Sequence, residues 1–384
     1  MASSFDKKWN KMLTMILMLV FLNMRQQVVV HGEPQVPCYF IFGDSLVDNG
    51  NNNPLLTAAK ANYPPYGIDF PDGPTGRFTN GLNTADITAE LLGFDKYIPP
   101  FASAKGKEIL NGVNYGSGAA GILIETGKHL GDVISLDRQL MHHQRTILSL
   151  TFLLGGVKKT HEYLQKCLYT VGMGNNDYIN NYLMPEYYPS SLLFSPDQFA
   201  TLLIQQYSLQ LKALYTLGAR KVAISGLGKL GSIPMYANKD PATIESINKA
   251  VQLADDKIKP LVDELNNLPG AQFIYLNSTS ISLGDPTPFG ISVFDAPCCK
   301  VSTTIAAGQC APGEVPCSNR TVNVFFDNFH PTEIANRLTA ARAYQAFLPT
   351  DAYPVDISNL VQDSTNNIQQ VFGKTKSDLS VGSF

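Results

Sequence analysis

Two short stretches, far apart in the sequence, carry the residue types of a serine hydrolase. The apolar run Tyr39–Phe42 leads into a Gly-Asp-Ser turn that ends at Ser45, a pattern typical of a buried strand whose turn presents one hydroxyl. Much later, Asp327 and His330 stand three positions apart. A carboxylate placed there can hold one imidazole nitrogen as a donor and leave the other free to take a proton from a hydroxyl. Each stretch alone is more often turn or capping chemistry, so the hydrolase interpretation depends on the rest of the chain.

Two glycine-rich stretches could stabilise an oxygen that becomes negative during acyl transfer. Residues 171–178 (Val-Gly-Met-Gly-Asn-Asn-Asp-Tyr) follow an apolar run and offer asparagine amides, and residues 114–121 (Asn-Tyr-Gly-Ser-Gly-Ala-Ala-Gly) offer backbone N–H groups. Glycines let the backbone approach a ligand closely, and amide donors suit an oxyanion. Both patterns also fit ordinary tight turns.

A helix should follow the Asp-His pair and fix its position. Pro331 suits the first position of a helix and Glu333 the third, and an apolar stripe continues to Phe347. We therefore expect Asp327 and His330 on the turn just before this helix.

Strands and helices alternate along the chain. Apolar runs predict strands at residues 38–42, 167–171, 221–225 and 272–276, and helical periodicity is clearest over residues 199–217 and 244–265. This rhythm predicts an α/β fold in which a mainly parallel sheet is covered by helices on both faces. Ligand sites in such sheets lie beyond the carboxyl ends of the strands, which is where Ser45 is expected.

The N-terminus reads as a secretory signal peptide. Lys7, Lys8 and Lys11 precede the apolar run Met12–Leu22, and small residues follow up to a cleavage position expected after Gly32. The run is shorter than the roughly 20 apolar residues that span a bilayer. We expect a secreted, extracellular protein with no integral membrane segment in the mature chain. A net charge of -3 argues against a nucleic-acid partner.

Secretion decides how the six cysteines are interpreted. Four crowd one loop-like stretch and indicate disulfides, whereas Cys38 and Cys167 begin two predicted strands and fit either buried thiols or a third bridge. The four are Cys298, Cys299, Cys310 and Cys317. Asn277 and Asn319 begin glycan acceptor patterns.

Neither a metal nor a nucleotide site is expected. No Cys-x-x-Cys or His-x-x-x-His pair is present, and we interpret the adjacent His142 and His143 as solvated surface. Residues 226–231 match Gly-x-Gly-x-x-Gly after a strand, but Pro234 follows where a dinucleotide site needs a helix to open at once. Gly-x-Ser-x-Gly, the other common serine-hydrolase motif, does not occur.

Four blocks together resemble the plant GDSL esterase/lipase family of the SGNH hydrolase superfamily. They are Phe-Gly-Asp-Ser-Leu-Val-Asp-Asn-Gly-Asn-Asn at residues 42–52, Asn-Tyr-Gly-Ser-Gly-Ala-Ala-Gly-Ile at 114–122, Gly-Asn-Asn-Asp-Tyr-Ile-Asn-Asn-Tyr at 174–182 and Phe-Phe-Asp-Asn-Phe-His-Pro-Thr-Glu at 325–333. They occur in the family's order and spacing, and the similarity extends from about Val36 to Pro354.

The resemblance implies a role for each matching position. Ser45 would be the nucleophile, His330 the base and Asp327 the residue that orients it. The Ser45 N–H, the Gly118 N–H and the Asn176 side chain would form the oxyanion hole. The family's fold is a single flavodoxin-like, three-layer α/β/α domain, and its members hydrolyse carboxylic esters without metal, nucleotide or other cofactor.

The chain departs from the family pattern at a few positions. Phe326 replaces a usual Trp, Ser232 a usual Cys, and Lys300 a usual Gly after the paired cysteines. None is a catalytic position, but the missing cysteine leaves the disulfide connectivity open.

The full expectation is a signal peptide over residues 1–32, one hydrolase domain over 33–354 and a surface or partly disordered tail over 355–384. The substrate would be a small-molecule or lipid-like ester, and the oligomeric state is left open. Two alternatives stay open: an acyltransferase that uses the same acyl-enzyme, and an inactive secreted binding protein on the same scaffold.

Overall fold

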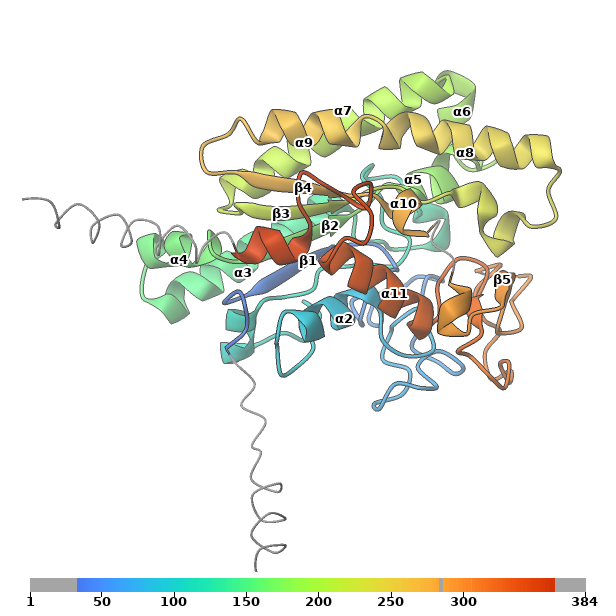
Figure 1. Ribbon diagram of the computed structural model, residues 1–384, viewed down its shortest axis with the longest axis horizontal. Coiled ribbons are helices and arrows are strands. Elements are labelled where there is room, and N and C mark those ends of the chain that lie inside the picture. Colours follow the sequence, from blue (N-terminus) through green and yellow to red (C-terminus); the bar gives the residue numbers. More distant parts are fainter. Residues whose placement is uncertain (1–32, 283–285, 305, 363–384) are drawn as a thin grey trace, which may run out of the picture. The chain divides into compact units, whose positions relative to one another are not determined.

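Four parallel strands form the centre of the fold (Figure 1). The computed structural model describes residues 33–282, 286–304 and 306–362. The strands, hydrogen bonded in this order, are β1 (Tyr39–Gly43), β2 (Leu168–Gly172), β3 (Lys221–Ser225) and β4 (Gln272–Leu276), and β7 (Ala352–Tyr353) pairs antiparallel with β4. Each of the four lies within one residue of its predicted bounds.

A short extended segment, residues 113–115, lies on the other side of β1. The Ile41 N–H donates to the Val113 carbonyl oxygen, and the Tyr115 N–H donates to that of Ile41. The second extended segment in the sequence therefore lies outside β1, and the third, β2, lies on its other flank. This is the strand order of flavodoxin-like folds, whose ligands bind where the order reverses. Ser45 follows β1 directly at that point.

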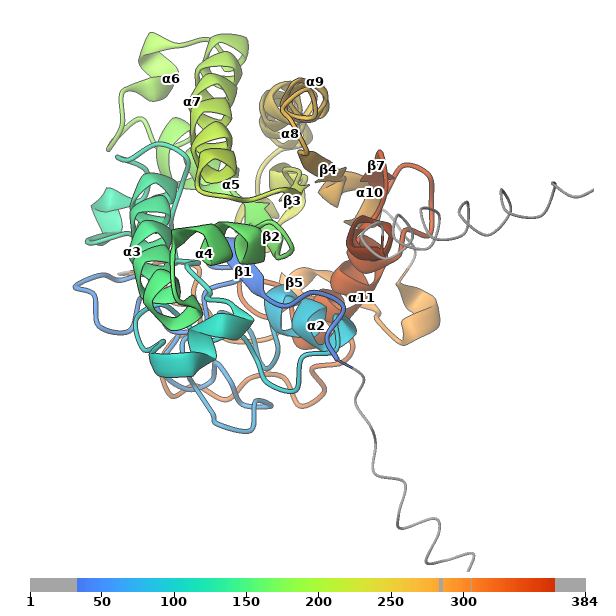
Figure 2. The same ribbon diagram turned by 90° about the vertical axis from the view of Figure 1, so that its left-hand side faces the viewer.

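The sheet separates two apolar cores. Phe40 and Phe42 of β1 belong to one buried cluster, and Tyr39 and Ile41 to the other, because successive side chains of a strand point to opposite faces. Figure 2 shows α3, α7 and α9 on one side of the sheet and α2 and α11 on the other. The predicted three-layer α/β fold with a mainly parallel sheet is confirmed.

Helices of very different length connect the strands. The α-helices are α2 (Thr84–Leu91), α3 (Leu136–Leu154), α4 (Val157–Leu164), α5 (Asn175–Asp177), α6 (Ser190–Leu193), α7 (Pro196–Thr216), α8 (Pro241–Asp255), α9 (Ile258–Leu265), α10 (Ser278–Ser282) and α11 (Glu333–Tyr344). Short 3₁₀ segments are η1 (Gly106–Asn111), η2 (Lys128–Leu130), η4 (Leu230–Ser232), η5 (Pro234–Tyr236) and η6 (Thr287–Phe289), and η3 (Tyr178–Tyr182) is a π-helical turn.

Two helix predictions need correction. The periodic run over residues 244–265 is two helices, α8 and α9, separated at Asp256 and Lys257. The helix after His330 begins at Glu333 rather than Pro331, because Pro331 still bridges back to Phe325 and Thr332 has an extended backbone. It ends at Tyr344, before the predicted Phe347.

A second, two-stranded parallel sheet and two disulfides frame the segment before α11. The strands are β5 (Val293–Pro297) and β6 (Asn323–Phe325). Cys298 pairs with Cys317 and Cys299 with Cys310, while Cys38 and Cys167 join the starts of β1 and β2. The connectivity that the sequence left open is thus three bridges, the third of them inside the core.

The described part of the predicted tail is not a surface segment. Residues 357–362 are helical, and Ile357, Leu360 and Val361 are buried in the core shared with α2. Their spacing is that of a helix face, a signal that the polar composition of the tail hid. The rest of the predicted tail and the predicted signal peptide lie outside the described residues.

Candidate active site

The end of β1 places Ser45 on a tight turn at the edge of the sheet. A Cβ atom at Gly43 would lie 2.5 Å from a methyl carbon of Val47 and 3.1 Å from the carbonyl oxygen of Gly172, so only glycine fits there without a shift. The N–H groups of Val47 and Asp48 donate to the Asp44 carbonyl oxygen and close the turn. Ser45 at its tip is partly exposed.

A buried glutamine fixes the same strand end. Gln139 of α3 is fully buried; its Oε1 accepts from the Gly43 N–H at 3.0 Å, and its Nε2 donates to the Gly43 carbonyl oxygen at 2.8 Å. The Ser117 N–H donates to that oxygen too. No sequence signal singled out Gln139, because a glutamine in a helix is usually solvated.

Ser45, His330 and Asp327 form one continuous chain of hydrogen bonds. The His330 Nε2 lies 2.7 Å from the Ser45 Oγ. The His330 Nδ1 lies 2.9 Å and 2.7 Å from the two carboxylate oxygens of Asp327. His330 is 5% exposed and Asp327 is not exposed at all. An imidazole held this way donates through Nδ1 and can accept the serine proton at Nε2.

The turn between β6 and α11 holds the carboxylate in place. The Phe326 N–H donates to the His330 carbonyl oxygen at 2.8 Å, and one oxygen of Asp327 accepts from the N–H groups of Phe329 and His330, each at 2.8 Å. The Tyr66 hydroxyl donates to the other oxygen at 2.5 Å. The sequence does not predict this role of Tyr66, because Tyr66 and Asp327 are far apart in the chain and come into contact only in the fold.

Asn176 borders the same space as Ser45. Its Nδ2 donates to the Ala120 carbonyl oxygen at 3.0 Å, and its Oδ1 accepts from Asn180 at 2.7 Å. An amide nitrogen carries two hydrogens, so the second N–H is available to a ligand.

The backbone at Gly118 does not fit its expected role. The Gly118 N–H donates to the buried carboxylate of Asp48 at 3.0 Å, so this donor is already engaged. Asp48 also accepts from the N–H groups of Gly50 and Asn51 and thereby ties the turn after Ser45 to the turn at Gly118. The neighbouring Ala119 lines the cavity, and no described residue accepts from its N–H.

A cavity of about 760 Å³ opens at the serine. Both apolar and polar side chains line it, and several of the apolar ones come from η3 and from the segments around η4 and η5. The apolar side chains include Ile179, Leu183, Met184, Leu230, Ile233 and Met235, and the polar ones include Glu186, Lys239, Thr304 and Gln309.

Burial changes the titration of the carboxylates around the serine. Burial raises the pKa of both Asp44 and Asp48 to about 6, opposed by hydrogen bonds from backbone N–H groups. The pKa of Asp177, which accepts from Ile122, Leu123 and Thr126 behind Asn176, also rises to about 6 through burial.

A family model described as GDSL-like lipase/acylhydrolase matches residues 39–343. The chain belongs to this family. The prediction made from the four sequence blocks is thereby confirmed, and membership places the protein among carboxylic ester hydrolases.

Curated relatives cover nearly the whole chain. Three GDSL esterase/lipases of Arabidopsis thaliana are 49%, 46% and 44% identical to it; they cover 87%, 87% and 91% of this chain and 94%, 95% and 98% of their own. A solved structure of an acetyl xylan esterase matches 81% of this chain and 99% of its own, with 12% identity and a TM-score of 0.34, a likeness too low to support any inference.

The paired histidines of this GDSL protein are not solvated surface, contrary to prediction. His143 is fully buried among Phe40, Phe42 and Tyr115, and its Nδ1 lies 3.0 Å from the Tyr115 hydroxyl. The ring of His142 stacks on Phe101 at 4.1 Å. Adjacent helix positions do face different ways, but both faces of α3 at this point meet other elements.

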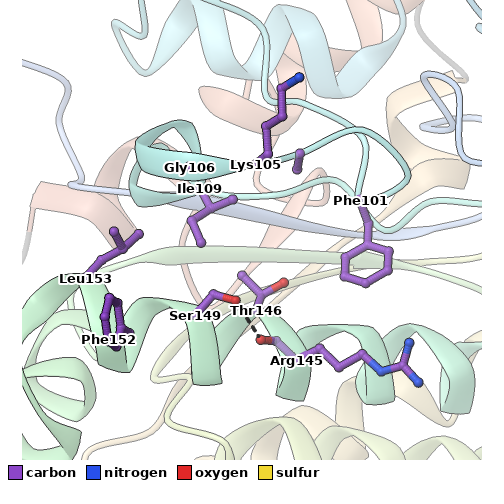
Figure 3. Close-up of a pocket in the computed structure, with 10 residues that line it drawn as sticks. Phe101, Lys105, Gly106, Ile109, Arg145, Thr146, Ser149, Phe152 and Leu153 are labelled. Carbon is purple, nitrogen blue, oxygen red and sulfur yellow. Dashed lines mark hydrogen bonds between the residues drawn. The ribbon is translucent and has the colours of Figure 1, made fainter.

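A second cavity of about 460 Å³ lies between η1 and α3 (Figure 3). Ile109, Phe152 and Leu153 contribute its apolar wall, and the Ser149 hydroxyl donates to the Arg145 carbonyl oxygen. None of the described residues that line it is a carboxylate or an imidazole, so it has no counterpart of the Ser45, His330 and Asp327 arrangement.

The remaining predicted sites have plain structural surroundings. Asn319 is exposed and its side chain accepts from Thr321, whereas Asn277 is half-buried and caps α10 through the Ser280 N–H.

After Gly226, the backbone enters the short η4 turn, and the Leu227 N–H donates to Asp255. Among the described residues, no group of three or more potential ligands could hold a metal ion. Within the same residues, no helix has the length and apolar character needed to cross a membrane.

Proposed function

We propose that this GDSL protein is a secreted serine esterase that hydrolyses carboxylic esters through an acyl-enzyme on Ser45. The observation that carries the proposal is the unbroken hydrogen-bond chain from the Ser45 Oγ through His330 to the buried Asp327, in which Ser45 and His330 line the larger cavity.

The geometry supports a two-step acyl transfer. His330 removes the proton of Ser45 as its oxygen attacks the ester carbonyl carbon, and the same ring then donates that proton to the leaving alcohol. Asp327 holds the ring and stabilises the imidazolium that forms between the two transfers. In the second half, His330 takes a proton from water, the resulting hydroxide attacks the acyl carbon, and Ser45 leaves with the proton restored.

Three donors would stabilise the oxyanion. They are the Ser45 N–H, the free N–H of the Asn176 amide and a backbone N–H from the turn after Tyr115. Since Gly118 donates to Asp48, we assign this last donor to Ala119, which lines the cavity and whose N–H has no acceptor among the described residues.

The disulfides and the predicted leader support secretion. Three bridges, one of them deep in the core, fit an oxidising compartment. We expect the mature chain, which begins after Gly32, to be found outside the cell.

Purified mature protein and a panel of nitrophenyl esters of increasing acyl length test this proposal. Ser45→Ala should lower turnover by several orders of magnitude, because the nucleophile is lost. Ser149→Ala, which alters an exposed serine of α3, is the control and should leave turnover unchanged. A fluorophosphonate should label Ser45 in the wild type, as judged by peptide mass spectrometry. Full activity in the Ser45 variant would refute the acyl-enzyme.

A further inference from the structure

The charge of Asp327 is held by neutral groups. Its carboxylate accepts from two backbone N–H groups, from His330 and from the Tyr66 hydroxyl, and no arginine or lysine among the described residues bonds to it. Tyr66 is therefore the only side chain besides the catalytic histidine that donates to this carboxylate within the described part of the chain.

The Tyr66 hydroxyl has only one place for its proton. The Cys310 N–H donates to the hydroxyl oxygen at 3.0 Å, so the tyrosine must accept there and donate to Asp327. The ring is 1% exposed and packs edge-on against Phe78 and Phe326. Burial raises the pKa of Tyr66 well above its ordinary value, which keeps the hydroxyl protonated.

The ring also connects the triad to a disulfide-bridged loop. Cys310, which donates to the Tyr66 hydroxyl, is bonded to Cys299, and the Cys299 N–H donates to the carbonyl oxygen of Phe326, the residue before Asp327. The hydroxyl and the bridge therefore hold the carboxylate from two sides. Phe78, which contacts Tyr66, also packs against the His330 ring at 4.9 Å.

We propose that Tyr66 is a positioning residue for acyl transfer: its hydroxyl fixes the orientation of the Asp327 carboxylate and moderates how strongly that carboxylate attracts the His330 proton. The inference rests on the proposed function. Without the hydroxyl, one carboxylate oxygen loses a donor in a site that water does not reach. The less stabilised carboxylate then turns more freely, so the ring is less well aligned with Ser45 and kcat falls. It also attracts the proton of His330 more strongly, so at acidic pH a smaller fraction of the rings is free to take the serine proton.

Tyr66→Phe and Tyr63→Phe form a matched pair for the test. The Tyr63 hydroxyl donates to the Cys310 carbonyl oxygen at 3.0 Å, so it holds the same loop but makes no hydrogen bond to Asp327. Tyr66→Phe should lower kcat by roughly 10- to 100-fold, change KM by less than about threefold and move the acid limb of kcat/KM to higher pH. Tyr63→Phe should leave kcat within about threefold of the wild type and the acid limb in place.

The outcomes separate this inference from the proposed function. Ester hydrolysis that is lost in Ser45→Ala but unchanged in Tyr66→Phe would overturn only the role of Tyr66. Equal losses in the two tyrosine variants, or a change confined to KM, would also overturn it, because packing of the loop would explain them.

If Tyr66→Phe does not fold, 3-fluorotyrosine at position 66 provides the second test. The fluorinated ring keeps nearly the same shape but is a stronger donor, so it should move the acid limb to lower pH, opposite to the loss of the hydroxyl. An unmoved acid limb would overturn the inference.

Discussion

His330 and His143 are both buried histidines, but they lie in opposite chemical settings. Both ring nitrogens of His330 have partners, Asp327 and Ser45, and its edge reaches the larger cavity. His143 lies beneath the sheet, bonds only to Tyr115, and its Nε2 has no partner among the described residues. Burial lowers the pKa of His143 to about 3.

Position in the topology, not burial, distinguishes the two histidines. His330 lies on the turn between β6 and α11, and its Nε2 meets Ser45, which follows β1 at the carboxyl end of the parallel strands. His143 lies on α3, which covers one face of that sheet, and four aromatic rings pack against it, those of Phe40, Phe42, Tyr115 and Tyr169. A ring in that setting can pack, but it cannot exchange a proton with a substrate.

The largest expected effect on activity comes from comparing substitutions of His330 and His143. His330→Ala should lower kcat/KM for a short acyl ester by about 10⁴-fold or more, because His330 is the only described residue that bonds to the Ser45 hydroxyl. His143→Phe, which keeps an aromatic ring in the same cluster, should stay within about threefold of the wild type. Comparable losses in both, with both variants folded by circular dichroism, would contradict the distinction.

The two halves of the candidate site could each be predicted because each half is local in sequence. Ser45 ends an apolar run and His330 lies on a turn with Asp327, so strand, turn and carboxylate-histidine patterns were visible, and the four blocks supplied the pairing. The four strands were found because parallel strands buried on both faces read as continuous apolar runs.

The parts that escaped prediction depend on contacts between distant segments. Tyr66 reaches Asp327 and Gln139 reaches Gly43 only through the fold, and neither residue type announces such a role. The sequence cannot place His143 in the core, because two adjacent histidines do not show which face of a helix is buried. Nor does a glycine-rich turn reveal that Asp48 accepts from the Gly118 N–H.

The second prediction tests whether the Asn176 side chain donates to the oxyanion. Asn176→Ala should lower kcat roughly 10²- to 10³-fold with little change in KM, since its amide would bond more strongly to the oxyanion than to the ground-state ester. Asn180→Ala removes the group that donates to the Asn176 oxygen and should cost only several-fold. Steady-state kinetics of both variants decides; a larger loss for Asn180→Ala would contradict a donor role for Asn176.

A smaller loss should follow when the turn behind the oxyanion donors is loosened. Asp48→Asn places an amide where three backbone N–H groups now meet a carboxylate, and its own N–H groups would oppose at least one of them. We expect kcat to fall about tenfold. Asp255→Asn is the control, because Asp255 is also a buried acceptor, for Leu227 and Tyr275, but on another part of the sheet edge. A similar loss of kcat in the control would point to general destabilisation.

The last prediction concerns stability rather than rate. His143 and three buried carboxylates change the free energy of unfolding in opposite directions as the pH falls. Because the pKa of His143 is lowered to about 3, the unfolded chain binds a proton below about pH 6.5 that the folded chain cannot, and stability falls as the pH falls. Asp44, Asp48 and Asp177 act in the other direction: with pKa values raised to about 6, they bind protons in the folded state first, so their contribution to stability grows as the pH falls from about 6 to about 4.

The pH dependence of the wild-type free energy of unfolding therefore contains both effects. The difference in this free energy between the wild type and His143→Phe isolates the contribution of the His143 ring. That difference in the free energy of unfolding should change in favour of the variant as the pH falls, with a slope that approaches about 1.4 kcal/mol per pH unit well below pH 6.5. Between pH 6.5 and pH 5 the change should be about 1.6 kcal/mol. Urea unfolding followed by circular dichroism at several pH values measures it. A difference that stays constant over this range would mean that the ring is protonated in the folded protein, and the contrast with His330 would then rest on position alone.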